Sequence, residues 1–162
     1  MRMLDRVDTK KVLVITDSNP GVDSSLTGIT QREQEELLVF NSYGALISQP
    51  YGCLMRNVIL AIYNEGIRDI YIVAEKAPQQ HDGDDLLEKM KEAGVTDQTL
   101  NTLNYLDAVQ HDVLNWLAGP SDVQEAMRKN KELIMKHPLI PGTVTVRTFL
   151  IDPETGEREE IF

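Results

Sequence analysis

The sequence predicts an α/β protein built on a central, mostly parallel sheet with helices on both faces. Two continuous apolar runs rich in β-branched residues, Val12–Thr16 and Ile70–Ala74, are typical of strands buried on both faces of a parallel sheet. A helical pattern over Tyr51–Glu65 leads directly into the second run, and strand, helix and strand in this order indicate a βαβ unit with a right-handed crossover. The 162 residues are enough for one hydrophobic core, so we expect a single domain over residues 1–162.

The N-terminal half is predicted to contribute three strands and one helix. Turn-forming residues at Asp17–Gly21 end the first strand, and Leu37–Phe40 is a second short strand that ends at Asn41–Gly44. The helix that follows ends at Gly66, where a glycine C-cap belongs. Its expected core positions are Leu54, Val58, Ile59, Ile62 and Tyr63.

The C-terminal half is predicted to be mainly helical before it ends in a hairpin. A polar loop over Glu75–Asp85 precedes the helices, and Trp116 is expected in the core. Thr143–Leu150 alternates with a period of two, which is typical of a half-buried edge strand. The turn at Asp152–Gly156 lets Glu157–Phe162 return as a second arm. The predicted helices cover residues 84–93, 97–116 and 121–136.

The composition excludes several classes of partner. Sixteen Lys and Arg residues stand against 26 Asp and Glu residues, a net charge of -10, so neither nucleic acid nor an anionic membrane surface is an expected partner. No apolar run reaches the length of about 18 residues that spans a bilayer. Met1–Lys11 also lacks the apolar stretch of a signal peptide. We therefore expect a cytoplasmic protein without a membrane-inserted segment.

The ends of the predicted strands carry the candidate binding residues. In parallel α/β sheets the ligand crevice lies at the carboxyl ends of the strands. Amide side chains and turn backbone at these ends could bind a small anion or another small molecule, although the same residues are also ordinary turn formers. The candidate ligand-binding residues of this strand-end pocket are Asp17, Asn19, Asn41, Gly44 and Glu75.

Several motifs, taken in order, resemble the β-carbonic anhydrases. Val39–Gly44 resembles the family's V-I-R-N-A-G-G strand end, and Glu65–Gln79 stands where the family has L-G-V-x-E-I-x-V-I-G-H-x-x-C-G. Asp122–Met127 is similar to the family's D-V-x-x-S-V helix, His137–Pro141 is the family's H-P-L-I-P, and Asp152–Gly156 matches D-x-x-T-G. The resemblance covers residues 11–161 and implies the β-carbonic anhydrase fold, zinc-dependent hydration of carbon dioxide, and assembly into dimers or higher oligomers.

The zinc ligands of that family do not carry over. The family binds zinc through the Cys of C-x-D-x-R after the first strand and through the His and Cys of H-x-x-C after the third. The second pair falls on Glu75 and Pro78, and the first Cys falls on Ile15 or on Asp17, depending on the alignment. Cys53 is the sole cysteine, so one chain cannot supply two thiolates. Because zinc-bound hydroxide attacks carbon dioxide in this mechanism, we predict a pseudoenzyme with no catalytic residues, no metal and no cofactor.

A replacement metal site is the alternative. Asp17, Glu75 and His81, with Asp82 or Asp84, could form an oxygen-rich site suited to zinc, manganese or iron. The same acidic stretch is also typical of a solvated loop and a helix start.

Two further residues have a structural and a functional interpretation. Cys53 lies among helix-forming apolar residues, which favours a buried structural cysteine over a reactive thiol or a zinc ligand shared between subunits. His137 precedes a proline and matches a family position outside the zinc site, so a structural role is favoured.

Three classes of function follow from these alternatives. The first is a non-hydratase that binds a small molecule or a partner, linked to bicarbonate or carbon dioxide handling. The second is a carbonic anhydrase, or another lyase or hydrolase, that uses a non-standard metal site. The third is a structural assembly subunit. We also expect a homodimer that buries the helix over Tyr51–Glu65 between subunits.

Overall fold

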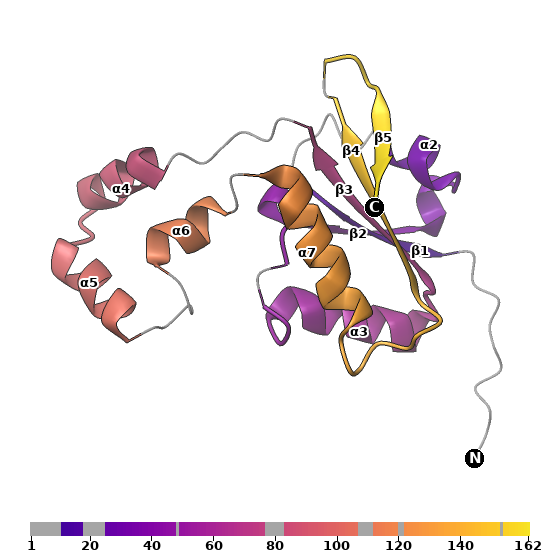
Figure 1. The fold of residues 1–162 in the computed structure, drawn as a ribbon, viewed down its shortest axis with the longest axis horizontal. Helices are drawn as coiled ribbons and strands as arrows, with labels where there is room; N and C mark the ends of the chain where they lie inside the picture. Colours follow the sequence, from indigo (N-terminus) through magenta and orange to yellow (C-terminus); the bar gives the residue numbers. More distant parts are fainter. Residues whose placement is uncertain are drawn as a thin grey trace. The chain divides into compact units, whose positions relative to one another are not determined.

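The computed structural model describes residues 11–17, 25–47, 49–76, 83–106, 112–119, 122–152 and 154–162 (Figure 1). The chain divides into two compact units. Unit 1 comprises Met1–Pro78 and Val123–Phe162, and unit 2 comprises Gln79–Asp122. Within the described ranges, no helix has the length and apolar character needed to cross a membrane.

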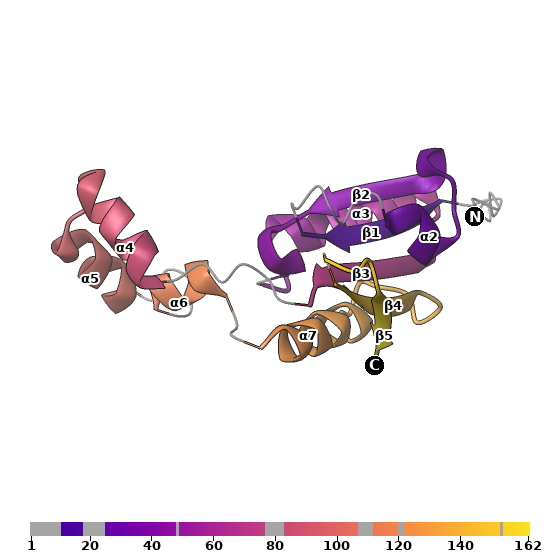
Figure 2. The same ribbon diagram turned by 90° about the horizontal axis from the view of Figure 1, so that it is seen from above.

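Unit 1 is built on a five-stranded sheet in the order β2-β1-β3-β4-β5 (Figure 2). β1 (Val12–Thr16) lies between β2 (Leu37–Asn41) and β3 (Asp69–Glu75) and is parallel with both. β4 (Thr145–Ile151) extends the parallel sheet beside β3, and β5 (Arg158–Ile161) pairs antiparallel with β4. All five residues of β1 and six of the seven in β3 are buried. The mostly parallel sheet, with both predicted buried strands in its interior, is confirmed.

Helices cover both faces of the sheet in unit 1. Side chains alternate along a strand, so Leu13 and Ile15 lie on one face and Val12 and Val14 on the other. α3 (Cys53–Glu65) and α7 (Val123–Met135) pack on the first face, and the short α2 (Leu26–Thr30) packs on the second (Figure 1).

α3 is the crossover between β2 and β3 that the sequence predicts. Its fully buried positions are Met55, Val58, Ala61 and Ile62. Of the other predicted core positions, Leu54 and Ile59 are half-buried and Tyr63 is 56% exposed. The buried face of the helix therefore coincides only in part with the predicted one. Gly66 ends the helix in the left-handed region, at φ 69°, which confirms the predicted cap.

The prediction that Thr143–Leu150 contains an edge strand is wrong. β4 is an interior strand, because β5 pairs along its outer side with Thr148 opposite Ile161. In β4 only Thr145 and Arg147 are exposed, so the period-two pattern reflects the start of the strand alone. The predicted hairpin arm is confirmed, since β5 lies within it and forms the sheet edge.

Unit 2 contains α4 (Gly83–Glu92), α5 (Asp97–Tyr105) and α6 (Val113–Ala118). The single helix predicted over residues 97–116 is thus replaced by two. A hydrogen bond links α5 to α6: Asn104 Oδ1 accepts the backbone N–H of Val113 at 2.9 Å.

Side-chain caps begin both of these helices. Thr96 Oγ1 accepts the backbone N–H of Thr99 at 3.2 Å, and Asp112 Oδ1 accepts that of Leu114 at 2.8 Å. Trp116 is 38% exposed rather than part of the core. Val113 is the buried residue of the short α6, and Trp116 and Leu117, one turn later, are both exposed.

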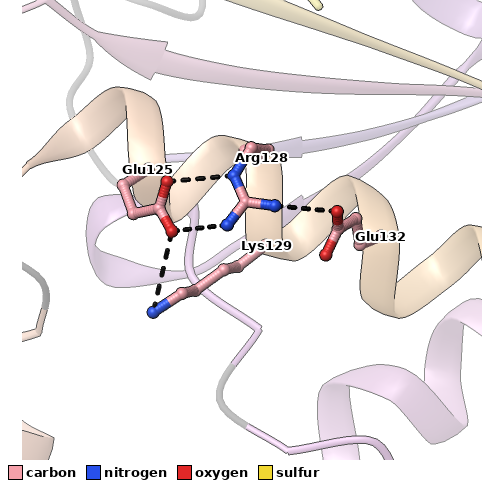
Figure 3. Close-up of polar contacts among 4 residues, drawn as sticks. All are labelled: Glu125, Arg128, Lys129 and Glu132. Atoms are coloured by element: carbon pink, nitrogen blue, oxygen red, sulfur yellow. Dashed lines mark hydrogen bonds and ion pairs between the residues drawn. The ribbon is translucent and has the colours of Figure 1, made fainter.

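The outer surface of α7 carries an ion-pair network (Figure 3). Arg128 donates to Glu125 Oε1 at 2.6 Å and to Glu132 Oε1 at 2.7 Å, and Lys129 Nζ lies 3.9 Å from Glu125. Hydrogen bonds from Arg128 hold the pKa of Glu125 below its usual range. Because all four side chains are partly exposed, the network contributes little to stability and supports the helix locally.

Candidate functional site

The carboxyl ends of β1, β2 and β3 bring the predicted site residues to one edge of the sheet. The register places Thr16 beside Asn41 on one side and Val73 on the other, and Glu75 ends β3 two residues later. Since side chains alternate, Thr16, Asn41 and Glu75 all belong to the face that α2 covers. Asp17 follows β1 directly. Asn19 lies outside the described residues.

Oxygen atoms dominate this strand-end site. Glu75 is 3% exposed, Asp17 is half-buried and Asn41 is exposed. The solvent exposure of these side chains thus increases from Glu75 to Asn41. The side chains that the structure describes at this edge are two carboxylates and an amide.

Thr16 is a residue of this site that the sequence analysis missed. Its side chain is completely buried, and its Oγ1 has no hydrogen-bond partner among the residues that the structure describes. A buried hydroxyl left unpaired costs about 1–3 kcal/mol. A bound water or ligand would satisfy it. The only sequence signal was a hydroxyl at the last position of an otherwise apolar strand, where threonine is also an ordinary strand former.

The loop after β2 shapes the outer side of the site. The backbone N–H of Ser42 donates to the carbonyl of Thr16 at 2.9 Å, which ties the loop to the end of β1. Gly44 and Ala45 then adopt left-handed conformations, with φ of 69° and 52°. A Cβ at Gly44 would meet no atom within 4 Å, so its backbone conformation is what favours glycine there.

A buried asparagine on α7 forms two hydrogen bonds to the backbone of this loop. Asn130 is 1% exposed; its Nδ2 donates to the carbonyl of Ala45 at 2.8 Å, and its Oδ1 accepts the N–H of Ile47 at 3.1 Å. The sequence analysis did not single out Asn130. Its signal is one amide at a core position of an apolar stripe, between Met127 and Ile134.

His137 has the structural role that the sequence favours. Its ring is 4% exposed, Nδ1 accepts the N–H of Leu139 at 3.2 Å, and Nε2 lies 2.8 Å from the carbonyl of Pro50. Those two partners assign the proton to Nε2. The ring of Tyr51 packs against it with centroids 5.1 Å apart. His137 thus links the loop after α7 to the segment before α3.

The expectation of a buried cysteine is wrong. Cys53 is exposed at the first position of α3, because the buried stripe of that helix starts at Met55. Its thiol lies on a different element from the strand-end residues.

The residues present do not fit a zinc site of two thiolates and an imidazole. β1 ends in Thr16 and is followed by Asp17, and β3 ends in Glu75; these side chains offer only oxygen donors. In the part of the chain that the structure describes, no group of three or more His, Cys, Asp or Glu residues is arranged to hold a metal. His81 and Pro78 lie outside that part, so the replacement site with His81 stays a prediction.

The chain is similar to carbonic anhydrase-like proteins in sequence. No protein-family profile matches it. The Bacillus subtilis carbonic anhydrase-like protein YbcF is 35% identical over 156 residues, which cover 91% of this chain and 85% of YbcF. YvdA of the same organism is 30% identical over 155 residues, which cover 94% of this chain and 77% of YvdA.

Solved structures share the fold at lower identity. The β-carbonic anhydrase isoform I of Trichomonas vaginalis superimposes with a TM-score of 0.79 at 17% identity, covering all of this chain and 87% of that one. A tetrameric β-carbonic anhydrase of Sordaria macrospora gives a TM-score of 0.59 at 15% identity, with 94% and 81% covered.

Proposed function

This chain belongs to the β-carbonic anhydrase family, and from that premise we propose that it is a non-hydratase member that binds a small molecule or a protein partner. We propose further that it acts in the cytoplasm, and the family membership suggests a role in bicarbonate or carbon dioxide handling.

The observation that carries the proposal is the set of donor atoms at the strand ends. Zinc-bound hydroxide forms near neutral pH because the metal lowers the pKa of bound water from about 16 to about 7. The chain has one cysteine, and it lies at the start of α3 rather than at a strand end. Carboxylates such as those of Asp17 and Glu75 do not by themselves generate hydroxide at neutral pH. This donor set supports binding rather than hydration.

The proposed ligand site is the strand-end pocket of Asp17, Asn19, Asn41, Gly44 and Glu75. The unpaired hydroxyl of Thr16 adds a hydrogen-bonding group on the same face as Glu75. The ligand that we propose is a small anion or another small molecule that can accept or donate hydrogen bonds at this edge.

A homodimer is part of the proposal. The tetrameric Sordaria macrospora enzyme supports assembly of this fold through its own surfaces. On α3, which the sequence assigns to the interface, Leu60 and Tyr63 are 38% and 56% exposed. A structural assembly subunit would use the same surface without a ligand.

The test combines metal analysis with a hydration assay. We expect untagged protein to contain far less than one zinc per chain, and stopped-flow hydration of carbon dioxide to stay at buffer background with or without added zinc, manganese or iron. Glu75→Ala and Cys53→Ser should behave like the unmodified chain in both measurements.

One metal per chain together with metal-dependent hydration would overturn the proposal. Glu75→Ala should then abolish hydration if Glu75 is a ligand, whereas Cys53→Ser should do so only if subunits share the metal. Stoichiometric metal without hydration would support the second candidate, an enzyme of different chemistry with a replacement site. The position of Asp17 and Glu75 at the same sheet edge is the observation that favours this candidate.

A further inference from the structure

We propose that Asn130 is a positioning residue for the strand-end pocket: through Ala45 and Ile47 it fixes the backbone of the loop of residues 42–47, which borders the pocket. The inference rests on the proposed function, in which Asn41 and Gly44 contact the ligand. It assigns part of that binding to a side chain on α7, outside the pocket.

The first argument is the backbone conformation of the loop. Gly44 and Ala45 follow each other in the left-handed region, with φ of 69° and 52°. Alanine is rare there because its Cβ crowds the backbone, and such a residue persists only where its surroundings fix it. Ala45 is completely buried. The loop therefore needs contacts with other elements to keep this shape.

The second argument is that the first half of the loop is already attached to the sheet. The backbone N–H of Ser42 donates to the carbonyl of Thr16 at 2.9 Å, at the end of β1. Within the loop, Ser42 Oγ donates to the carbonyl of Leu46 at 2.8 Å, and the N–H of Ala45 donates to the carbonyl of Ser42 at 2.8 Å. A second attachment, at Ala45 and beyond, would fix the whole loop.

The third argument is that Asn130 provides this second attachment. It is 1% exposed and lies between Met127 and Ile134, two completely buried residues of α7. An amide at such a position is costly unless both its ends are hydrogen-bonded. Here Nδ2 donates to the carbonyl of Ala45 at 2.8 Å, and Oδ1 accepts the N–H of Ile47 at 3.1 Å. An apolar side chain would leave both backbone groups without these partners.

The course of the chain connects Asn130 to the pocket. Asn41 comes directly before the loop and is the register partner of Thr16. Gly44 lies within the loop, one residue before the carbonyl that accepts from Asn130. A shift of Ala45 therefore moves Gly44 as well. Asn130 thus acts on the pocket through the backbone and not by contact with the ligand.

Amide hydrogen exchange, followed by NMR, tests the contact. Asn130→Leu keeps the size of the side chain but removes both hydrogen bonds. The amides of Ala45 and Ile47 should then exchange at least tenfold faster relative to the amide of Ile72 in β3. The matched control is Ile134→Ala on the same helix, which removes apolar volume and should change the exchange of all three amides together.

Asn130→Asp separates positioning from general stabilisation. The introduced carboxylate can accept the N–H of Ile47 but has no proton to donate to the carbonyl of Ala45, whereas the protonated carboxyl can do both. Burial raises the pKa of such a carboxyl. The amide resonance of Gly44 should therefore be displaced from its usual position at neutral pH and return to it at acidic pH. A residue that only filled space would show no such return.

A titration with sodium bicarbonate, followed at the amide resonances of Asn41 and Gly44, tests the effect on binding. The unmodified chain and Ile134→Ala should bind bicarbonate alike, and Asn130→Leu should bind it at least tenfold more weakly. Equal affinity in all three would overturn the inference.

The other outcomes separate this inference from the proposed function. Equal acceleration of exchange at Ala45, Ile47 and Ile72 in Asn130→Leu overturns the inference, and so does a Gly44 resonance that does not return in Asn130→Asp. If Asn130→Leu fails to fold, the pH series of Asn130→Asp decides by itself. Bicarbonate that moves no resonance of the unmodified chain counts against the proposed ligand, and the loop amides then still decide whether Asn130 positions the loop.

Discussion

Unit 1 and unit 2 have helices in common but differ in how they bury apolar side chains. In unit 1, α3 and α7 pack on a sheet whose interior strands are almost completely buried. Among the described residues of unit 2, only Leu100 and Val113 are buried. Residues 79–122 also carry nine acidic against two basic residues, so most of the net charge of -10 belongs to the smaller unit. A sheet gives each helix a broad apolar surface to cover, which three short helices do not give one another.

The largest expected effect tests this difference directly. Ile72 is completely buried in β3, so Ile72→Ala should reduce the free energy of unfolding of unit 1 by about 2–5 kcal/mol. Leu100→Ala in α5 should cost clearly less, because Leu100 is still 8% exposed and has fewer apolar neighbours to leave behind.

Two spectroscopic probes can follow the units separately. Trp116 is the sole tryptophan and lies in unit 2, so its fluorescence reports that unit, while far-ultraviolet circular dichroism reports both. In urea titrations, Ile72→Ala should shift mainly the circular dichroism transition and Leu100→Ala mainly the fluorescence transition. Coincident transitions with equal shifts in both variants would show that the units unfold as one, contrary to this comparison.

A smaller effect is expected where unit 1 depends on a single polar side chain. Asn130→Ala removes two hydrogen bonds and leaves the carbonyl of Ala45 and the N–H of Ile47 buried without partners. We expect a loss of about 2 kcal/mol in the free energy of unfolding. Asn57→Ala on the exposed side of α3 is the matched control and should change stability by less than about 0.5 kcal/mol. Equal effects of the two substitutions would mean that Asn130 does not hold the loop.

The smallest effect is expected at the periphery of unit 1, where exposure resembles that of unit 2. Asp152 Oδ1 accepts the backbone N–H of Glu154 at 2.9 Å and that of Thr155 at 3.3 Å, and these bonds lower the pKa of Asp152. A carboxylate with a lowered pKa in the folded state stabilises above its unfolded value and loses that contribution as the pH falls through the folded value. Asp152→Ala should therefore lower the Tm slightly at pH 7, and the difference should vanish at acidic pH.

The control for that pH dependence is Glu154→Ala, which removes the same charge from the same turn. Thermal melts of both variants at a series of pH values below 7 make the comparison. If the two variants lower the Tm equally at every pH, the hydrogen bonds of Asp152 contribute nothing beyond its charge.

How far the sequence predicts the fold depends on whether a signal is local. β1 and β3 follow from continuous apolar runs, which need no partner to be recognised. β4 was predicted at an edge because Thr143–Leu150 alternates with a period of two, and Arg147 is one of its polar positions. In the structure that guanidinium lies over the rings of Tyr71 and Phe149, 5.6 and 5.2 Å from their centroids, while Glu160 pairs with it. A charged residue on an interior strand is thus accommodated by tertiary contacts that no local pattern contains.

The candidate site was predictable in location and less so in content. Asp17, Asn41 and Glu75 follow predicted strands, so their common edge could be inferred from topology. The roles of Thr16 and Asn130 could not, because each depends on long-range packing. Asn130 contacts Ala45 and Ile47 across more than 80 residues of sequence. The exposure of Cys53 depends on a helix rotation of less than one turn, which apolar spacing alone does not resolve.

The pairing of β3 with β4 has a consequence for how the protein is made. Asp69 and Thr145 are register partners 76 residues apart, and all of unit 2 is synthesised between them. While a ribosome translates unit 2, β3 can already pair with β1, but its other edge has no partner. A nascent chain therefore presents Ile70, Ile72 and Ala74 on an open strand until the last part of the protein emerges. That interval is when aggregation competes with folding, and a stop codon before β4 would make it permanent.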